Sequence, residues 1–164
     1  MRRSGFTLIE LIFVMVVIGV LAAIALPKFK NLKENAELSN MIAAYTTVVK
    51  NAPASYLNYT ELSGLSSSEV NITSLLKVPT FNCPATGTRK NCWWKNNEDY
   101  IRYYADGSNY VQFYFYNKNN GLLGILFSIT NSKNKEHFQK VLSNKLGLVF
   151  VGDKNTTIID LTQQ

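Results

Sequence analysis

One acidic residue, Glu10, lies inside the most apolar stretch of this 164-residue chain. It is the only charged residue between positions 6 and 26. A helix rises by about 1.5 Å per residue, so this run would span about 30 Å, the hydrocarbon thickness of a bilayer. A carboxylate in such a position costs on the order of a few kcal/mol, less near the headgroups than at the centre. Glu10 is therefore expected to have a function and a cationic partner.

The residues before Glu10 carry a specific motif. Two arginines, Arg2 and Arg3, precede a Gly5–Phe6 junction, and the string GFTLIE then opens the apolar run. This pattern resembles the class III signal of type IV pilins and of the related type II secretion pseudopilins. The resemblance implies that a prepilin peptidase/methyltransferase cuts after Gly5 and methylates the new amino group of Phe6. It also implies that Glu10 pairs with the positive amino terminus of a neighbouring subunit when helices bundle in a filament.

The resemblance extends over about the first 27 residues. Pro27 stands where the family often has a helix-kinking proline, and Gly19 is a second weak point in the helix. The implied partners are the peptidase, the inner-membrane assembly platform, other pilins and the lipid bilayer. The implied location is the bacterial inner membrane, crossed once with the head in the periplasm, and then a filament. The motif leaves open a pilus, a secretion pseudopilus or a minor subunit used for DNA uptake.

An ordinary secretory signal is the main alternative for this segment. Cleavage after Ala25 would release a soluble secreted binding domain that begins at Leu26. Against this alternative, the apolar run exceeds the usual ~7–15 residues, Glu10 interrupts it, and a helical pattern continues beyond Pro27. A plain membrane anchor would explain the span but not the GFTLIE string.

The charge balance is compatible with a small exported domain. The chain has 17 Lys and Arg and 11 Asp and Glu; removing residues 1–5 takes away two arginines and no acid, which leaves a side-chain balance of +4. Such a mild positive charge suits anionic headgroups or DNA, and supports neither strongly.

The helical and strand patterns that must position these residues predict an α+β fold. In this pilin-like fold, one long N-terminal helix packs on a C-terminal antiparallel sheet. Residues 1–5 are the expected leader, 6–27 the transmembrane and assembly half of the helix, and 28–53 its amphipathic half. The head is expected to cover 54–164. Apolar residues recur at helical spacing in the second half, and Pro53 is the expected stop. The stripe consists of Phe29, Leu32, Ala36, Met41, Tyr45, Val48 and Ala52.

The head contains the only two cysteines, Cys83 and Cys92. An even pair in an oxidising periplasm predicts a disulfide, worth about 2–3 kcal/mol in the chain-entropy model, with two free thiols as the alternative. Zinc is disfavoured because structural sites need four Cys or His ligands. Of Trp93 and Trp94, one is expected to anchor this loop on the core and the other to be a contact residue.

The rest of the head reads as strands and short helices. After a turn-like stretch, a short helix is expected from Ser68-Glu69 to Pro79. The predicted strands are 100–104, 110–116 and 122–129, followed by a helix over 132–146 and a final hairpin of 148–151 with 157–161. One face of the second strand carries Tyr110, Gln112, Tyr114 and Tyr116. This face is interpreted as covered by the long helix or by neighbouring subunits, rather than as a platform for nucleic-acid bases.

The other candidate sites rest on weaker sequence signals. Asn71 and Asn155 lie in sequences resembling the extended bacterial glycosylation sequon, and chance matches are the alternative. Asp153 and Asp160 are the candidate ligands if the head binds calcium, as some pseudopilins do. His137 is interpreted as an exposed surface residue. No catalytic constellation, metal motif or cofactor loop is recognisable, so a structural protein rather than an enzyme is expected.

Overall fold

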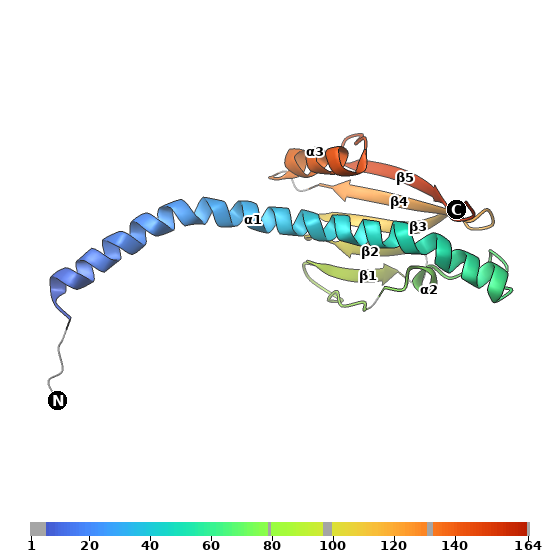
Figure 1. Ribbon diagram of the computed structural model, residues 1–164, viewed down its shortest axis with the longest axis horizontal. Coiled ribbons are helices and arrows are strands. Elements are labelled where there is room, and N and C mark those ends of the chain that lie inside the picture. The colour runs from blue at the N-terminus through green and yellow to red at the C-terminus, as the bar shows by residue number, and fades with distance from the viewer. Residues whose placement is uncertain (1–5, 79, 97–99, 131–132, 164) are drawn as a thin grey trace, which may run out of the picture. The chain divides into compact units, whose positions relative to one another are not determined.

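The computed structural model describes residues 6–78, 80–96, 100–130 and 133–163. The chain divides into two compact units, one up to Ala36 and one from Glu37 onward. Its elements (Figure 1) are α1 (Leu8–Leu57), the π-helix η1 (Asn58–Leu62), α2 (Ile72–Leu76), β1 (Cys92–Asn96), β2 (Tyr100–Tyr104), β3 (Asn109–Asn117), β4 (Leu122–Ile129), α3 (Lys135–Leu146) and β5 (Lys154–Asp160). A long N-terminal helix followed by an antiparallel sheet confirms the predicted α+β, pilin-like fold class.

The first unit contains the apolar part of α1. This part is long and apolar enough to cross a membrane, and none of its most apolar 18-residue window is buried within the chain. Large side chains such as Phe13 (70% exposed) and Leu21 (61%) lie open on its surface. Contiguous exposed apolar surface of this size marks a membrane or protein interaction surface.

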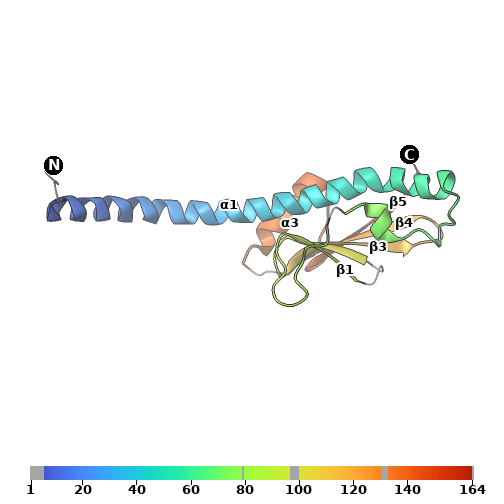
Figure 2. The same cartoon turned by 90° about the horizontal axis from the view of Figure 1, so that it is seen from below.

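The second unit contains the part of α1 that packs on the sheet. Leu38, Met41, Val48, Ala52 and Tyr56 are buried at helical spacing and join a core with the inner face of the sheet. Figure 2 shows this part of α1 running along one face of the sheet. The predicted stripe is therefore correct from Met41 onward.

The beginning of the predicted stripe is not packed on this core. Phe29 (65% exposed), Leu32 (61%) and Ala36 are exposed and belong to the first unit. Their apolar character follows the same helical period, but no other element of their own unit covers them.

The predicted helix stop at Pro53 is wrong. The helix continues through Pro53 to Leu57, and η1 extends it to Leu62, so part of the expected loop is helical. Proline removes one helical hydrogen bond at a cost of about 3 kcal/mol. Burial beyond it offsets this cost, because Tyr56 is only 3% exposed and its hydroxyl donates to Ser67 at 2.8 Å.

Helix α2 is shorter than expected. It starts at Ile72 because Asn71 caps it: the Asn71 side-chain oxygen accepts the Thr73 N–H at 2.8 Å. It ends at Leu76, with Lys77 in the left-handed conformation (φ 46°). The expected stop, Pro79, lies outside the described residues.

The sheet is an antiparallel meander in the order β1-β2-β3-β4-β5. The predictions for β2 and β4 are correct at both ends, and β3 is one residue longer than predicted at each end. Strand β1 was not predicted. The final hairpin is wrong in its first strand and in its pairing: among residues 148–151 only Val151 forms a bridge, to Lys154. Its second strand, 157–161, is correct over 157–160, which belong to β5, but β5 begins at Lys154 and pairs with β4.

The two faces of β3 differ as predicted. Val111 and Phe113 are fully buried under α1, whereas Tyr110, Gln112 and Tyr114 are only partly buried on the opposite face. Tyr45 of α1 packs against Phe127, the register partner of Val111, which places the helix on the inner face. Of the two alternatives expected for the tyrosine face, cover by the long helix is therefore wrong, and cover by neighbouring subunits stays a prediction.

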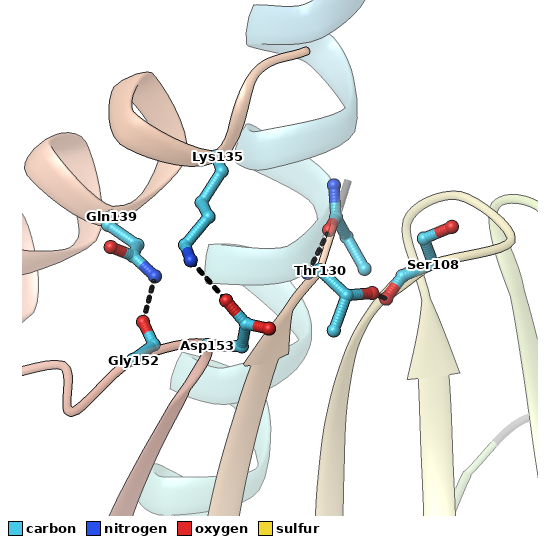
Figure 3. A network of polar contacts seen from close by, with 7 residues as sticks. Ser108, Thr130, Lys135, Gln139, Gly152 and Asp153 are labelled. Atoms are coloured by element: carbon cyan, nitrogen blue, oxygen red, sulfur yellow. Dashed lines mark hydrogen bonds and ion pairs between the residues drawn. The ribbon is translucent and has the colours of Figure 1, made fainter. Parts of the chain in front are cut away.

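Helix α3 is attached to the loop before β5 (Figure 3). Lys135 forms an ion pair with Asp153, and the Gln139 side chain donates to the Gly152 carbonyl at 2.8 Å. Phe138 and Leu142 fill the core beneath the helix. The helix was predicted from residue 132, which lies outside the described residues, and begins at Lys135.

Candidate functional site

Glu10 and Thr7 form a capping box at the start of α1. The Glu10 carboxylate oxygen Oε2 accepts the Thr7 backbone N–H at 2.8 Å and the Thr7 hydroxyl at 2.7 Å. In return, the Glu10 N–H donates to the Thr7 hydroxyl oxygen at 3.4 Å. The first N–H groups of a helix lack intrahelical partners, and this reciprocal arrangement satisfies two of them. The sequence signal for it, a Thr three residues before a Glu at the start of an apolar run, is present in the string GFTLIE.

The carboxylate lies on an apolar helix surface. Phe6, Ile9, Phe13 and Val14 surround Glu10 in a shallow depression. All four apolar side chains are exposed, from Val14 at 45% to Phe6 at 87%. Glu10 is thus a single acid in a surface that would be in contact with lipid or with other apolar helices.

The predicted cleavage junction lies at the edge of the described chain. Phe6 is exposed and precedes the helix, whereas Gly5 lies outside the described residues. Gly19 and Pro27, the predicted weak points, both lie inside α1, and a side chain at Gly19 would meet nothing within 4 Å. The kink at these positions stays a prediction.

The first 26 residues match the family model described as the prokaryotic N-terminal methylation motif. The chain is 50% identical over 48 residues to the type IV narrow pilus major component PilA5 of Thermus thermophilus, which covers 29% of this chain and 41% of that protein. It is 36% identical over 66 residues to a fimbrial protein of Neisseria meningitidis serogroup B, covering 40% of this chain and 39% of that protein. No solved structure is significantly similar to the chain.

The amino-terminal segment of this chain is similar to that of type IV pilins. The alignments span about two fifths of the length of these two relatives. In this segment, Thr7 and Glu10 are the polar side chains at the helix start, and the apolar run after them is the candidate membrane span.

The head behind this amino-terminal segment contains the predicted disulfide. Cys83 and Cys92 are bonded, with Cα atoms 5.1 Å apart, and Cys92 is buried. The bridge joins the start of β1 to the preceding loop, where the Cys83 N–H also donates to the Trp93 carbonyl at 3.1 Å. These contacts fix both ends of the loop between the cysteines.

The two tryptophans face opposite sides of the sheet. Trp93 packs on the core side, edge-on to Tyr103 at 5.2 Å between ring centroids. Trp94 lies on the outer side, where the guanidinium of Arg89 stacks 4.7 Å from its ring. Trp93 is therefore the predicted anchor, and Trp94 belongs to the outer face.

The predicted modification sites are already hydrogen-bonded. The Asn71 side-chain oxygen caps α2, and the Asn155 amide nitrogen donates to the Val149 carbonyl at 2.7 Å. A glycan attaches to that nitrogen, so modification of Asn155 would require this bond to open. Glycosylation at both positions stays a prediction.

The remaining titratable candidates are dispersed. Asp153 pairs with Lys135, and Asp160 accepts the Thr162 hydroxyl and N–H, which lowers the pKa of Asp160 below its usual value. Among the described residues, no three His, Cys, Asp or Glu side chains lie together. His137 is exposed, as predicted, and contacts the Phe138 ring.

Proposed function

We propose that this chain is a membrane-inserted precursor of a pilus subunit. A prepilin peptidase cuts between Gly5 and Phe6 and methylates Phe6, and the assembly platform then extracts the chain into a filament. The observation that carries the proposal is the lone carboxylate of Glu10 on an exposed apolar helix that begins with the methylation motif.

The chemistry of Glu10 supports a pairing role. A carboxylate in an apolar helix bundle is costly alone and tolerable beside a cation. Its Oε2 is occupied by Thr7, while Oε1 has no hydrogen-bond partner in the described part of the chain. The second oxygen can therefore accept a hydrogen bond from the positive amino terminus of Phe6 in a neighbouring subunit. One such pair per subunit would set the axial register between subunits, as a lone polar group does in a coiled coil.

The rest of the segment fits insertion before assembly. The apolar part of α1 would cross the inner membrane once, with Arg2 and Arg3 on the cytoplasmic side and the head in the periplasm. We divide the chain into a leader (1–5), a transmembrane and assembly half (6–27), and a second helical part that begins at residue 28 and, in place of the predicted end at 53, continues to Leu62. The rest of the head follows it up to residue 164. The two relatives are a pilus component and a fimbrial protein, which favours a pilus over a secretion pseudopilus.

Intact-mass and amino-terminal analysis of the membrane fraction tests the processing step. A chain that begins with methylated Phe6 is expected. A chain that begins at Leu26 would contradict the proposal and would indicate an ordinary signal peptide with a soluble secreted domain.

Replacing Glu10 by alanine tests the assembly step. Glu10→Ala is expected to leave processing and membrane insertion intact while largely removing the chain from sheared filaments. The control is Glu34→Ala, which removes an acid from the same helix outside the apolar run and is expected to assemble normally. Normal incorporation of Glu10→Ala would reject the pairing role.

A further inference from the structure

A groove in the head lies between α1 and the disulfide-linked edge of the sheet. It has a volume of about 410 Å³, within the range of small-molecule sites. Its lining residues are Asn40, Ala43, Ala44 and Thr47 from α1, Asn82 and Asn91 beside the disulfide, Trp93 from β1 and Tyr103 from β2. All eight belong to the second unit, so the groove does not depend on how the N-terminal half of α1 is placed.

The lining is uncharged, polar and aromatic. It contains no Asp, Glu, Lys, Arg or His, although the whole chain is basic. The Tyr103 phenol is neutral at physiological pH, since its ordinary pKa is about 10 and burial raises that pKa further. A charged ligand would find no counter-ion here, which disfavours anions and cations alike.

Hydrogen bonds fix the orientation of the two asparagines beside the disulfide. The Asn82 Oδ1 accepts the Trp93 N–H at 3.0 Å, so the Asn82 amide nitrogen must point elsewhere. The Asn91 Oδ1 accepts from the Asn40 amide at 3.0 Å and from the Tyr103 hydroxyl. The amide nitrogens of Asn82 and Asn91 have no acceptor among the described residues, which leaves four N–H donors at the groove.

The backbone at Asn91 is in the left-handed conformation. Its φ is 48°, a region that asparagine adopts more readily than other non-glycine residues. The two hydrogen bonds to its side chain and the Cys83–Cys92 bridge next to it hold this conformation. The donors are therefore pre-organised, which lowers the entropy that a ligand must offset on binding.

We infer that this groove binds a neutral oligosaccharide. Each sugar hydroxyl is both a donor and an acceptor and so matches the free amide N–H groups and the Thr47 hydroxyl at the rim. The C–H face of a pyranose ring is apolar and flat and fits the half-buried Trp93 indole in the wall. The absence of charge from the lining selects neutral over sialylated or sulfated sugars.

The test uses the full-length chain in a polyoxyethylene detergent, because a sugar-based detergent would compete for the groove. The probe is an array of neutral hexose and N-acetylhexosamine oligosaccharides with their sialylated and sulfated counterparts. Binding to neutral members is expected, and the best of them is then titrated by calorimetry. Absence of neutral binding, or binding confined to the acidic members, would overturn the inference.

Two variants locate the binding within the groove. Asn82→Asp keeps the acceptor for the Trp93 N–H but removes the free donors, and it is expected to weaken affinity at least about fivefold. Ala43→Trp places an indole at an exposed groove position without touching the core and is expected to abolish binding. Unchanged affinity in both variants would overturn the inference.

Asn117→Asp is the matched control. Asn117 is also an exposed asparagine whose Oδ1 accepts one backbone N–H, that of Asn120 at 3.3 Å, but it lies outside the groove. The same chemical change there is expected to leave affinity unchanged, and an equal loss would show a non-specific effect of charge. If the groove instead receives a second copy of the chain, the detergent-solubilised monomer binds no sugar, and a photo-crosslinker attached to the thiol of an Ala43→Cys variant joins neighbouring subunits in filaments. That result also overturns the inference.

Discussion

The ring of Tyr114 covers Gly124 on the neighbouring strand. The two residues are register partners in β3 and β4, on the face opposite α1. A β-carbon at Gly124 would lie 2.4 Å from Cζ of Tyr114, far inside van der Waals contact. The glycine thus provides the space in which the tyrosine ring lies flat on the sheet, an arrangement known as aromatic rescue of a strand glycine.

Replacing Gly124 by alanine should destabilise the head. The added methyl group must displace the Tyr114 ring, and overpacking of this kind costs about 1–3 kcal/mol. Urea unfolding followed by far-UV circular dichroism gives the free energy of unfolding. In a Tyr114→Ala background the same substitution should cost little, because the obstructing ring is gone. Equal losses in both backgrounds would show that the contact is not responsible.

The sequence predicted the central strands because turn residues bracket them. Asp106-Gly107 and Asn119–Gly121 separate three runs of aromatic and β-branched residues, and the ends of β2 and β4 match the prediction. Strand β1 is not a run of this kind, because its two tryptophans, Trp93 and Trp94, are followed by the polar residues Lys95 and Asn96. It is a strand because it pairs with β2. Local propensity is weaker than such tertiary pairing.

The pairing of the final strand was predicted wrongly because a sequence does not reveal the pairing partner. Residues 148–151 are apolar, but Val149 (75% exposed) and Val151 (84%) lie in a loop. The more polar β5 pairs with β4 along its whole length and extends the sheet. Pro53 failed as a helix stop for a related reason, since the burial of Tyr56 cannot be read from local sequence.

The candidate site was predictable only where it is continuous in sequence. The motif around Glu10 occupies a few consecutive residues, and the capping partner Thr7 follows from the same string. The groove, by contrast, gathers residues between Asn40 and Tyr103 from four segments. Only the fold brings these segments together, so no linear pattern indicated it.

The disulfide should contribute to the stability of the head. Reduction of the Cys83–Cys92 bridge is expected to lower the free energy of unfolding by about 2–3 kcal/mol through the larger entropy of the unfolded chain. Urea unfolding with and without a phosphine reductant measures the difference, with a Cys83→Ser/Cys92→Ser double variant as the control that reductant should not affect. Ready alkylation of the native, unreduced protein would contradict the bridge.

Acid should weaken the turn before α2. The Ser66 hydroxyl donates to the Glu69 carboxylate at 2.7 Å and the Ser66 N–H at 2.9 Å, and these bonds lower the pKa of Glu69. Because the pKa of Glu69 in the folded state lies below that in the unfolded state, these bonds stabilise the fold fully above the usual carboxyl pKa of about 4.3. This stabilisation is lost as the pH falls through the folded-state pKa.

A Ser66→Ala variant tests this pH dependence. The variant should be less stable than wild type at pH 7, and the difference in the free energy of unfolding should become smaller toward pH 3. Urea unfolding at both pH values measures this difference. Glu69→Gln should show the same narrowing, since it removes the charge. A gap that stays constant with pH would mean that the serine acts without the carboxylate.

The capping box should also affect filament assembly. Thr7→Val preserves side-chain shape but removes the hydroxyl that binds Glu10 and caps α1, a loss of about 1 kcal/mol for a typical N-cap. In cells that express equal amounts of tagged wild type and variant, wild type should therefore be enriched about fivefold in sheared filaments relative to the membrane fraction. Thr7→Ser keeps the hydroxyl and should incorporate like wild type. If Thr7→Val incorporates equally well, Glu10 acts without its cap; if Thr7→Ser is as deficient as Thr7→Val, the methyl group rather than the hydrogen bond is what assembly requires.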